Sequence, residues 1–173
     1  MSALALGPLE FIAGEWIVGD PTARESRYLK LEQGGLGYWV QGVEAQVIPW
    51  SRLMDLRLSA QPSRLGNSRT VAVLTDLALA LTGISRHGGG EAYLAATLRN
   101  PYEDWVAHFS HASRNYRKRE IRQAEELFRQ TIGCGRAAKL GDLHWVAETV
   151  EKIASLAAGS RDVKAHIGGI VRS

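Results

Sequence analysis

With 173 residues, of which 45% are hydrophobic and 23% charged, the chain has the length and composition of one globular domain, or of one domain with a helical appendage. A core of this size needs no metal or disulfide to stabilise it, and the one cysteine, Cys134, excludes an intrachain disulfide and favours a reducing compartment. The net charge of +3 is too small to indicate a nucleic-acid partner by itself.

The hydropathy of the chain favours a soluble cytoplasmic protein. The opening residues, MSALALGPLEF, form too short a run for a signal peptide and lack its basic n-region. No run approaches the roughly 18 apolar residues of a membrane span. We therefore expect no transmembrane segment, and we do not expect peripheral contact with a membrane.

The first part of the chain has the pattern of short strands. Its segments are rich in aromatic and β-branched residues and are separated by glycine or by GDP. Pro49 marks an edge or a bend, and Leu56 and Leu58 alternate with Asp55 and Arg57. These features predict strands over residues 14–18, 27–32, 37–42, 45–50 and 53–60.

Residues 61–91 are harder to assign. The composition of residues 61–68 predicts a loop, and SRHGGG at 85–90 predicts a turn. Between them, residues 70–84 alternate like strands, yet their Ala and Leu content also fits a buried helix. We favour one or two strands there and leave the helix open. A further strand is expected over residues 91–99.

The hydrophobic period changes at Asn100. The residues NPYED offer an N-cap, a proline at the first helical position and Glu103 three residues after the cap. An apolar stripe at helical spacing follows, made of Trp105, Phe109, Ala112 and Tyr116. We expect an amphipathic helix that begins at Asn100.

Three more helices are expected in the last third of the chain. The first ends at the Gly133 and Gly135 pair, and its apolar stripe is Ile121, Ala124, Leu127, Phe128 and Ile132. The second has Asp142 as its N-cap, and its stripe is Leu143, Val146, Val150, Ile153 and Ala157. The third is short and carries Val163, Ile167 and Ile170.

Three passages of the sequence carry a resemblance to a known family. They are GEWIVG at 14–19, the passage 34–58 with its IPWSRLMDLRL ending, and YLAATLRNPYEDWVAHF at 93–109. These passages resemble the opening strand, the hairpin followed by IPWSRI, and the last strand with its closing helix in bacterial pleckstrin-homology-like (PH-like) domains. Trp105 would match the tryptophan that such domains place in the closing helix.

The resemblance covers residues 9–113 and implies an α+β fold, a small antiparallel β-barrel or sandwich closed by an amphipathic helix. Residues 114–173 would then be a C-terminal helical extension. A competing likeness is the lipocalin-type barrel, because FIAGEWIV at 11–18 resembles the G-x-W opening of those ligand carriers. Such a barrel should continue with strands after residue 100, where we expect a helix instead.

PH domains that hold phosphoinositides usually do so with lysines and arginines between their first two strands. The matching segment here contains Arg24, Arg27 and Lys30, but it also contains Asp20 and Glu25, and the first strand lacks the family's lysine. The resemblance offers the three cations as a site for a small-molecule or anionic ligand, such as a phosphate or a lipid headgroup. Many PH-like folds are instead protein-interaction modules, and the fold alone does not fix the function.

His108 and His111 lie three residues apart, so on one helix both could ligate one metal ion. The other potential ligands, Cys134, His144 and His166, have no recognisable ligand spacing. On a helix, His108 would border the apolar stripe and His111 would turn toward solvent. We therefore expect two structural histidines and assign no metal, no cofactor and no catalytic residue.

A cluster of five cations follows the two histidines, made of Arg114, Arg117, Lys118, Arg119 and Arg122. The apolar stripes before and after the cluster would point about 100° apart on one helix, so we expect a break near Ser113–Arg117. Cations and backbone N–H groups in the first turn of the new helix would suit an anion or an acidic partner surface. An ordinary solvated face, relieved by Glu125 and Glu126, is the alternative.

These patterns favour a non-enzymatic interaction or regulatory module that binds a protein partner, or itself, in the cytoplasm. The stripes of residues 118–133 and 143–157 offer a helix-pair interface for a homodimer. Trp39 and Trp50 flank one hairpin, either as core residues or as the lining of a partner groove. A binder of a small or anionic ligand is the alternative, and an enzyme that uses the two histidines is the least favoured.

Overall fold

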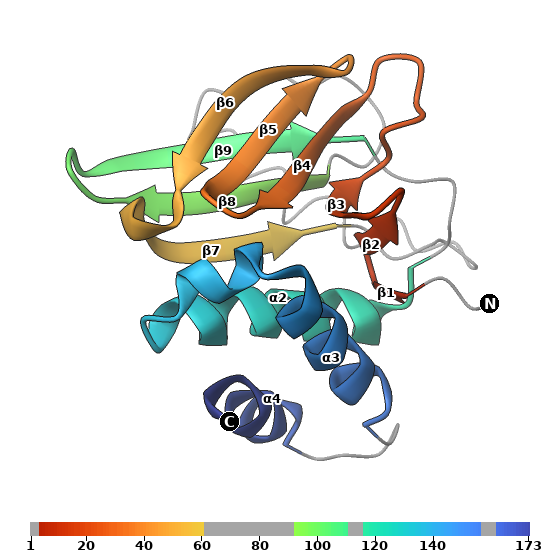
Figure 1. Cartoon of the computed structure of the whole chain (residues 1–173), viewed down its shortest axis with the longest axis vertical. Coiled ribbons are helices and arrows are strands. Elements are labelled where there is room, and N and C mark those ends of the chain that lie inside the picture. Colours follow the sequence, from red (N-terminus) through yellow and green to blue (C-terminus); the bar gives the residue numbers. More distant parts are fainter. Residues whose placement is uncertain (1–3, 61–91, 111–115, 157–161) are drawn as a thin grey trace, which may run out of the picture.

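The computed structural model describes residues 4–60, 92–110, 116–156 and 162–173, and within them the chain is an α+β protein. Two antiparallel sheets form one part of the molecule and a layer of helices forms the other (Figure 1). The segment 70–84, His111 and Arg114 lie outside the described residues. None of the described helices is both long enough and apolar enough to cross a membrane.

The larger sheet is a six-stranded antiparallel meander in which each strand pairs with the next one along the chain. The strand predictions for residues 14–50 are confirmed, with bounds that shift by one or two residues. The strands are β1 (Ala5–Leu6), β2 (Leu9–Ile12), β3 (Glu15–Gly19), β4 (Arg27–Glu32), β5 (Gly35–Val40) and β6 (Val43–Pro49). A 3-10 turn, η1 (Trp50–Arg52), leads out of this sheet.

The smaller sheet has three antiparallel strands, and the strands predicted over residues 53–60 and 91–99 are its first two. Its members are β7 (Leu53–Ser59), β8 (Ala92–Leu98) and β9 (Glu103–Phe109). Alternate residues of β8 are buried, as expected for a strand with one face on the core. These inward residues are Ala92, Leu94, Ala96 and Leu98.

Side chains join the two sheets. The Tyr38 hydroxyl donates to the backbone carbonyl of His108 at 3.1 Å, and the Trp105 Nε1 donates to the Gln46 Oε1 at 3.0 Å. The Trp105 and Tyr38 rings meet edge to face, with their centroids 6.3 Å apart. The described strands therefore form two linked sheets and not a closed barrel, because β6 and β9 each end a sheet.

The prediction of a helix from Asn100 is wrong. Asn100, at φ +57°, and Pro101, after a cis peptide bond, belong to the turn between β8 and β9. Residues four apart share a face in a helix, but they also share a face in a strand, so Trp105 and Phe109 fit both structures. The buried Ala107 between them follows only the strand period, and pairing with β8 supplies the backbone hydrogen bonds.

The strand at residues 103–109 bears on both family resemblances. Trp105 lies on β9 and links the two sheets, so it does not belong to a helix that closes a barrel. A strand after residue 100 also removes the objection to a lipocalin-type barrel. The described strands nevertheless stay in two sheets, which is not the closed barrel that such carriers have.

The helical layer follows the predictions more closely. The chain forms α2 (Lys118–Gly133), η2 (Ala137–Gly141), α3 (Leu143–Ala154) and α4 (Val163–Arg172). The expected helix over residues 118–133 is confirmed, with Arg117 as its N-cap. Asp142 caps α3 as predicted, because its carboxylate accepts the Trp145 backbone N–H at 3.1 Å.

Most described members of the apolar stripes pack inside the chain, whereas Leu143 at the start of α3 is exposed. In Figure 1, α2 lies below β7, and α3 and α4 lie against the other helical elements; the closest packing is α2 on β7 and α4 on α2. Phe128 of α2 and Val150 of α3 have no exposed surface. A homodimer through these stripes would require the core to open, and it stays a prediction.

Glu125→Gln is expected to raise stability at neutral pH. Burial raises the pKa of the Glu125 carboxyl, and the negative charge of Glu126 raises it further. An acid whose pKa is raised by folding is least costly when protonated, so its contribution to stability falls as pH rises from its unfolded pKa through its folded pKa. Glutamine stays neutral and avoids this loss.

Urea unfolding should therefore show a gain for Glu125→Gln near pH 7 that disappears near pH 3, below the ordinary glutamate pKa of about 4.3. The exposed Glu148 of α3 offers a matched control, and Glu148→Gln should show no such pH-dependent gain. A gain of the same size for both variants at both pH values would mean that burial of the Glu125 charge is not its cause.

Candidate functional site

A cleft of about 850 Å³ lies between the larger sheet and the helical layer. One wall comes from β3 and β4, and the other comes from η2 and the start of α3. Six titratable side chains line it, three from each wall: Glu15, Lys30 and Glu32, then Lys139, Asp142 and His144. The two walls are about 110 residues apart in the sequence.

Close packing around Gly141 holds the walls together. A Cβ atom at this position would lie 2.5 Å from the Glu32 carbonyl oxygen and 2.9 Å from the Trp50 Nε1, so only glycine fits. The Trp50 Nε1 donates to the same Glu32 carbonyl at 2.8 Å. At the other end of this contact, the Trp16 Nε1 donates to the Leu143 carbonyl at 3.3 Å. The Trp16 hydrogen bond therefore ties the helical wall to the sheet, and the Trp50 indole lies against Gly141 from the sheet side.

On the sheet wall, Lys30 already has an ion pair and an aromatic contact within the chain. The Lys30 ammonium lies 2.8 Å from the Glu15 carboxylate and 4.1 Å from the centre of the Trp39 ring. Only 15% of the Lys30 side chain is exposed. The Trp39 ring in turn stacks on Tyr28, with the centroids 6.2 Å apart. Ion pairing and the cation–π contact thus hold Lys30 flat on the sheet.

Glu32 is held in a different way. Its Oε1 accepts the Trp39 Nε1–H at 3.0 Å, and the side chain lies across Gly37, where a Cβ atom would collide with it. Within the described residues, Glu32 has no ion pair with a lysine or arginine. The carboxylate is therefore positioned by an indole, and no lysine or arginine in the described part of the chain forms an ion pair with it.

The helical wall is closer to neutral. Asp142 accepts the Trp145 backbone N–H, and its carboxylate lies 3.5 Å from the Lys139 ammonium. The hydrogen bond from Trp145, followed by the charge of Lys139, lowers the pKa of the Asp142 carboxyl. The positive end of α3 already has a carboxylate of its own and is not free for an external anion.

Apolar surface extends the cleft at the end near Trp16. The Leu143 side chain lines the cleft and is 42% exposed. Phe11 of β2 is 39% exposed and lies against the Trp16 ring, with the centroids 5.3 Å apart. Trp16 therefore contacts both the Phe11 ring and the Leu143 backbone.

The predicted basic cluster lies elsewhere, at the start of α2. Arg117, Lys118 and Arg122 are exposed there. Arg119 is partly buried, and its guanidinium donates to the Leu156 carbonyl, which joins the start of α2 to the end of α3. The charges are spread around the helix start, and the contact made by Arg119 is structural. Anion binding by this cluster stays a prediction.

The alternative set of Arg24, Arg27 and Lys30 divides between two surfaces. Arg24 is exposed in the connection before β4, and Arg27 is the first residue of that strand. Arg27 and Lys30 are three residues apart in one strand, so their side chains leave opposite faces of the sheet. Lys30 alone lines the cleft, and there its charge is paired with Glu15.

His108 lies on β9, beside Tyr93 of β8, with the ring centroids 6.0 Å apart. The helical geometry that would have aimed it and His111 at one metal is absent at His108, because that residue is in a strand. Among the described residues, no three His, Cys, Asp or Glu side chains are grouped so that they could hold a metal ion.

Sequence reasoning overlooked the cleft and named only parts of it. Trp39 was considered for a partner groove, and it does lie beside the cleft, whereas Trp50 is buried beneath it. Asp142 was predicted as a helix N-cap, but nothing local shows that the neighbouring Gly141 packs on the β4–β5 turn. In comparisons with protein-family models, curated proteins and solved structures, no match to the chain was found.

Proposed function

We propose that this chain is a non-enzymatic binding module and that an extended segment of a protein partner lies in the cleft between β4 and the η2–α3 wall. The cleft itself carries the proposal. Its volume of about 850 Å³ lies in the range of about 300–1,000 Å³ that is typical of ligand sites. We expect the module to act in the cytoplasm and without a cofactor.

The walls support a preformed site. Lys30 and Asp142 are held by ion pairs, and Glu32 by a hydrogen bond from Trp39, so little side-chain ordering is left for the moment of binding. The exposed Leu143 side chain adds apolar surface to the charged lining of the cleft. A peptide with charged and apolar side chains fits this sequence of surfaces better than a compact molecule does.

The binding role is inferred from the cleft and not from the resemblance to PH-like domains, which stays a prediction. It agrees with the sequence-based expectation of a protein partner, but it assigns the partner to a different surface. The expected contact surfaces were the helix stripes and the basic cluster. Most described members of the stripes are buried in the core, and the exception, Leu143, lines the cleft to which we assign the partner.

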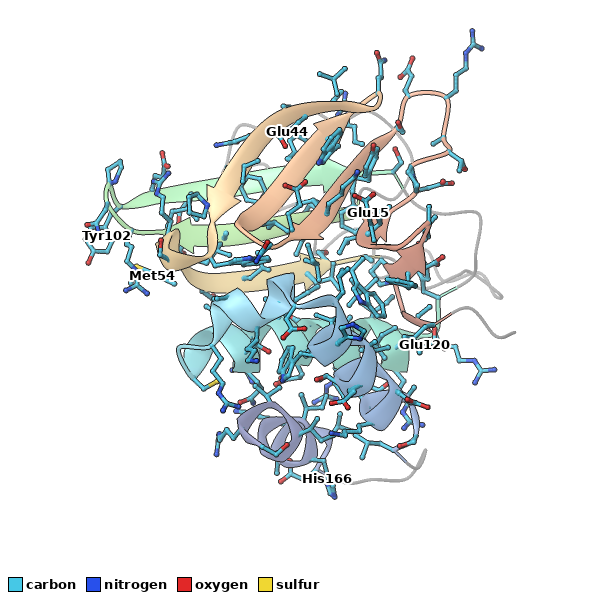
Figure 2. All side chains as sticks on the ribbon, viewed as in Figure 1. Glu15, Glu44, Met54, Tyr102, Glu120 and His166 are labelled. Carbon is cyan, nitrogen blue, oxygen red and sulfur yellow. The ribbon has the colours of Figure 1, made fainter. Side chains whose placement is uncertain are left out.

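Photo-crosslinking in cells tests this position. A benzophenone side chain at Leu143 should form a crosslinked adduct with a partner, whereas the same group at Tyr102, which is 77% exposed, should not. Figure 2 shows Tyr102 at the opposite end of the sheets from Glu15. Ala138→Trp places a large side chain on the exposed cleft wall and should remove the adduct without unfolding the chain.

Several results would contradict the proposal. Equal adducts at the two positions would indicate nonspecific contact, and an adduct that survives Ala138→Trp would place the partner outside the cleft. If a folded protein formed no adduct at Leu143, the cleft would not be the binding site. Circular dichroism of the Ala138→Trp variant checks that the fold is retained.

A further inference from the structure

We propose, on the basis of the binding role inferred above, that the partner's segment places a lysine or arginine side chain against Glu32 in the cleft. The charge balance of the walls, the orientation of the Glu32 carboxylate and the adjoining apolar surface point to this chemistry. Each is a property of described residues.

The charges that line the cleft do not cancel. Glu15 pairs with Lys30, and Asp142 pairs with Lys139, so four charges form two nearly neutral pairs. Glu32 then remains as a carboxylate without an ion pair among the described residues. A partly desolvated carboxylate in a concave wall attracts a cation and repels an anion. The cleft thus selects a ligand group with one positive charge.

The same balance opposes an anionic ligand. A phosphate in the cleft would meet three carboxylates and two ammonium groups that are already paired. The start of α3 offers little compensation, because the Asp142 carboxylate already accepts the Trp145 backbone N–H there. An anion would therefore have to break existing ion pairs, whereas a cation could pair with Glu32 without breaking any.

The geometry of Glu32 also favours a cation carried on an alkyl stem. The Trp39 indole holds Oε1 at 3.0 Å, and no described residue donates a hydrogen bond to Oε2. The carbon stem of Lys30 lies beside it on the same strand, and the exposed Leu143 side chain lines the same cleft. A lysine or arginine stem can lie along such a surface while its charged end reaches the carboxylate.

A double-mutant cycle tests the contact. The probes are the peptide acetyl-Leu-Lys-Leu amide and its norleucine analogue, which has the same stem without the charge, titrated while the Trp39 indole resonance is followed by NMR. The lysine peptide should bind the wild type about fivefold more tightly than the norleucine peptide does. Glu32→Gln should abolish this difference. Glu25→Gln, in the connection before β4, should preserve it.

For a second variant, Lys30→Met, we expect tighter and not weaker binding of the lysine peptide. Lys30→Met keeps a stem on Trp39 but frees the Glu15 carboxylate, so the lysine peptide should bind this variant more tightly than it binds the wild type. The anionic-ligand alternative predicts instead that inorganic phosphate binds the wild type at this indole and that Lys30→Met weakens it. Phosphate binding of that kind would overturn the inference.

The remaining outcomes separate the two proposals. Equal binding of the lysine and norleucine peptides, or a difference that survives Glu32→Gln, would overturn the basic side chain but leave the cleft as the binding site. If n-butylammonium binds as tightly as the lysine peptide, a free amine and not a partner segment is the source of the cation. If no peptide shifts the Trp39 indole resonance or the cleft amides, both proposals fail.

Discussion

Gly141→Ala is expected to destabilise the folded chain by about 2–3 kcal/mol, the cost of overpacking a site that cannot relax. The added methyl group would lie 2.5 Å from the Glu32 carbonyl oxygen and 2.9 Å from the Gln33 Cα, both of which are backbone atoms. Its third neighbour is the Trp50 indole, which is itself held by a hydrogen bond to the same carbonyl. The contact that sets the distance between the cleft walls would have to open.

Urea unfolding measures this loss, and Gly133→Ala is the matched control. Gly133 ends α2, and a Cβ atom there would meet nothing within 4 Å. Its replacement should change stability by about 1 kcal/mol at most, in the stabilising direction. If the two variants unfold at the same urea concentration, η2 does not pack on the β4–β5 turn.

Phe128→Ala is expected to cost about 3–5 kcal/mol, the range for removing a fully buried aromatic side chain. Phe128 has no exposed surface, and its helix packs on β7 and on α4. Arg122→Ala on the exposed side of the same helix should change stability by about 0.5 kcal/mol or less. Equilibrium denaturation of the two variants gives both numbers.

The same position also separates a core from an interface. If the stripe of α2 served a homodimer, Phe128→Asp would leave a folded chain and change only its elution in size-exclusion chromatography. The buried position predicts loss of the fold itself, seen as loss of the cooperative unfolding transition. A folded, monomeric Phe128→Asp variant would therefore contradict the packing of α2 on β7.

The sequence predicted most elements because their local signals agreed. Arg27–Glu32 was predicted with its full bounds, since apolar and charged residues alternate from Leu29 to Glu32 and clear turn signals flank the segment. The start of α3 was equally visible, because Asp142 is a preferred N-cap and its side chain makes the expected hydrogen bond. Such signals depend on a few neighbouring residues and not on the strands or helices that pack against them.

The incorrect prediction of a helix over residues 100–109 also has a cause in the local sequence. NPYED satisfies every rule for a helix start, but a tight turn also uses Asn and Pro, and Asn tolerates the left-handed conformation found at Asn100. The apolar spacing of four residues between Trp105 and Phe109 could not separate strand from helix. Only pairing with β8 decides the matter, and pairing is a nonlocal property.

The cleft could not be predicted from local patterns. Its walls come from Glu32 and from Gly141, which meet only because the helical layer folds back over the larger sheet. The cation cluster at Arg114–Arg122 was predicted to suit an anion or an acidic partner because its charges are adjacent in sequence. In the fold, the informative charge is a single glutamate whose neighbours leave it without an ion pair among the described residues.

Mapping the lysine peptide onto the folded chain tests the central claim most directly. Titration of acetyl-Leu-Lys-Leu amide into ¹⁵N-labelled protein should shift the backbone amides of Gly14 and Gln33 on one wall together with those of Gly141 and His144 on the other. The amides of residues 118–122 at the start of α2 should not move. Shifts confined to the start of α2, or to one wall alone, would contradict a binding cleft between the sheet and the helical layer.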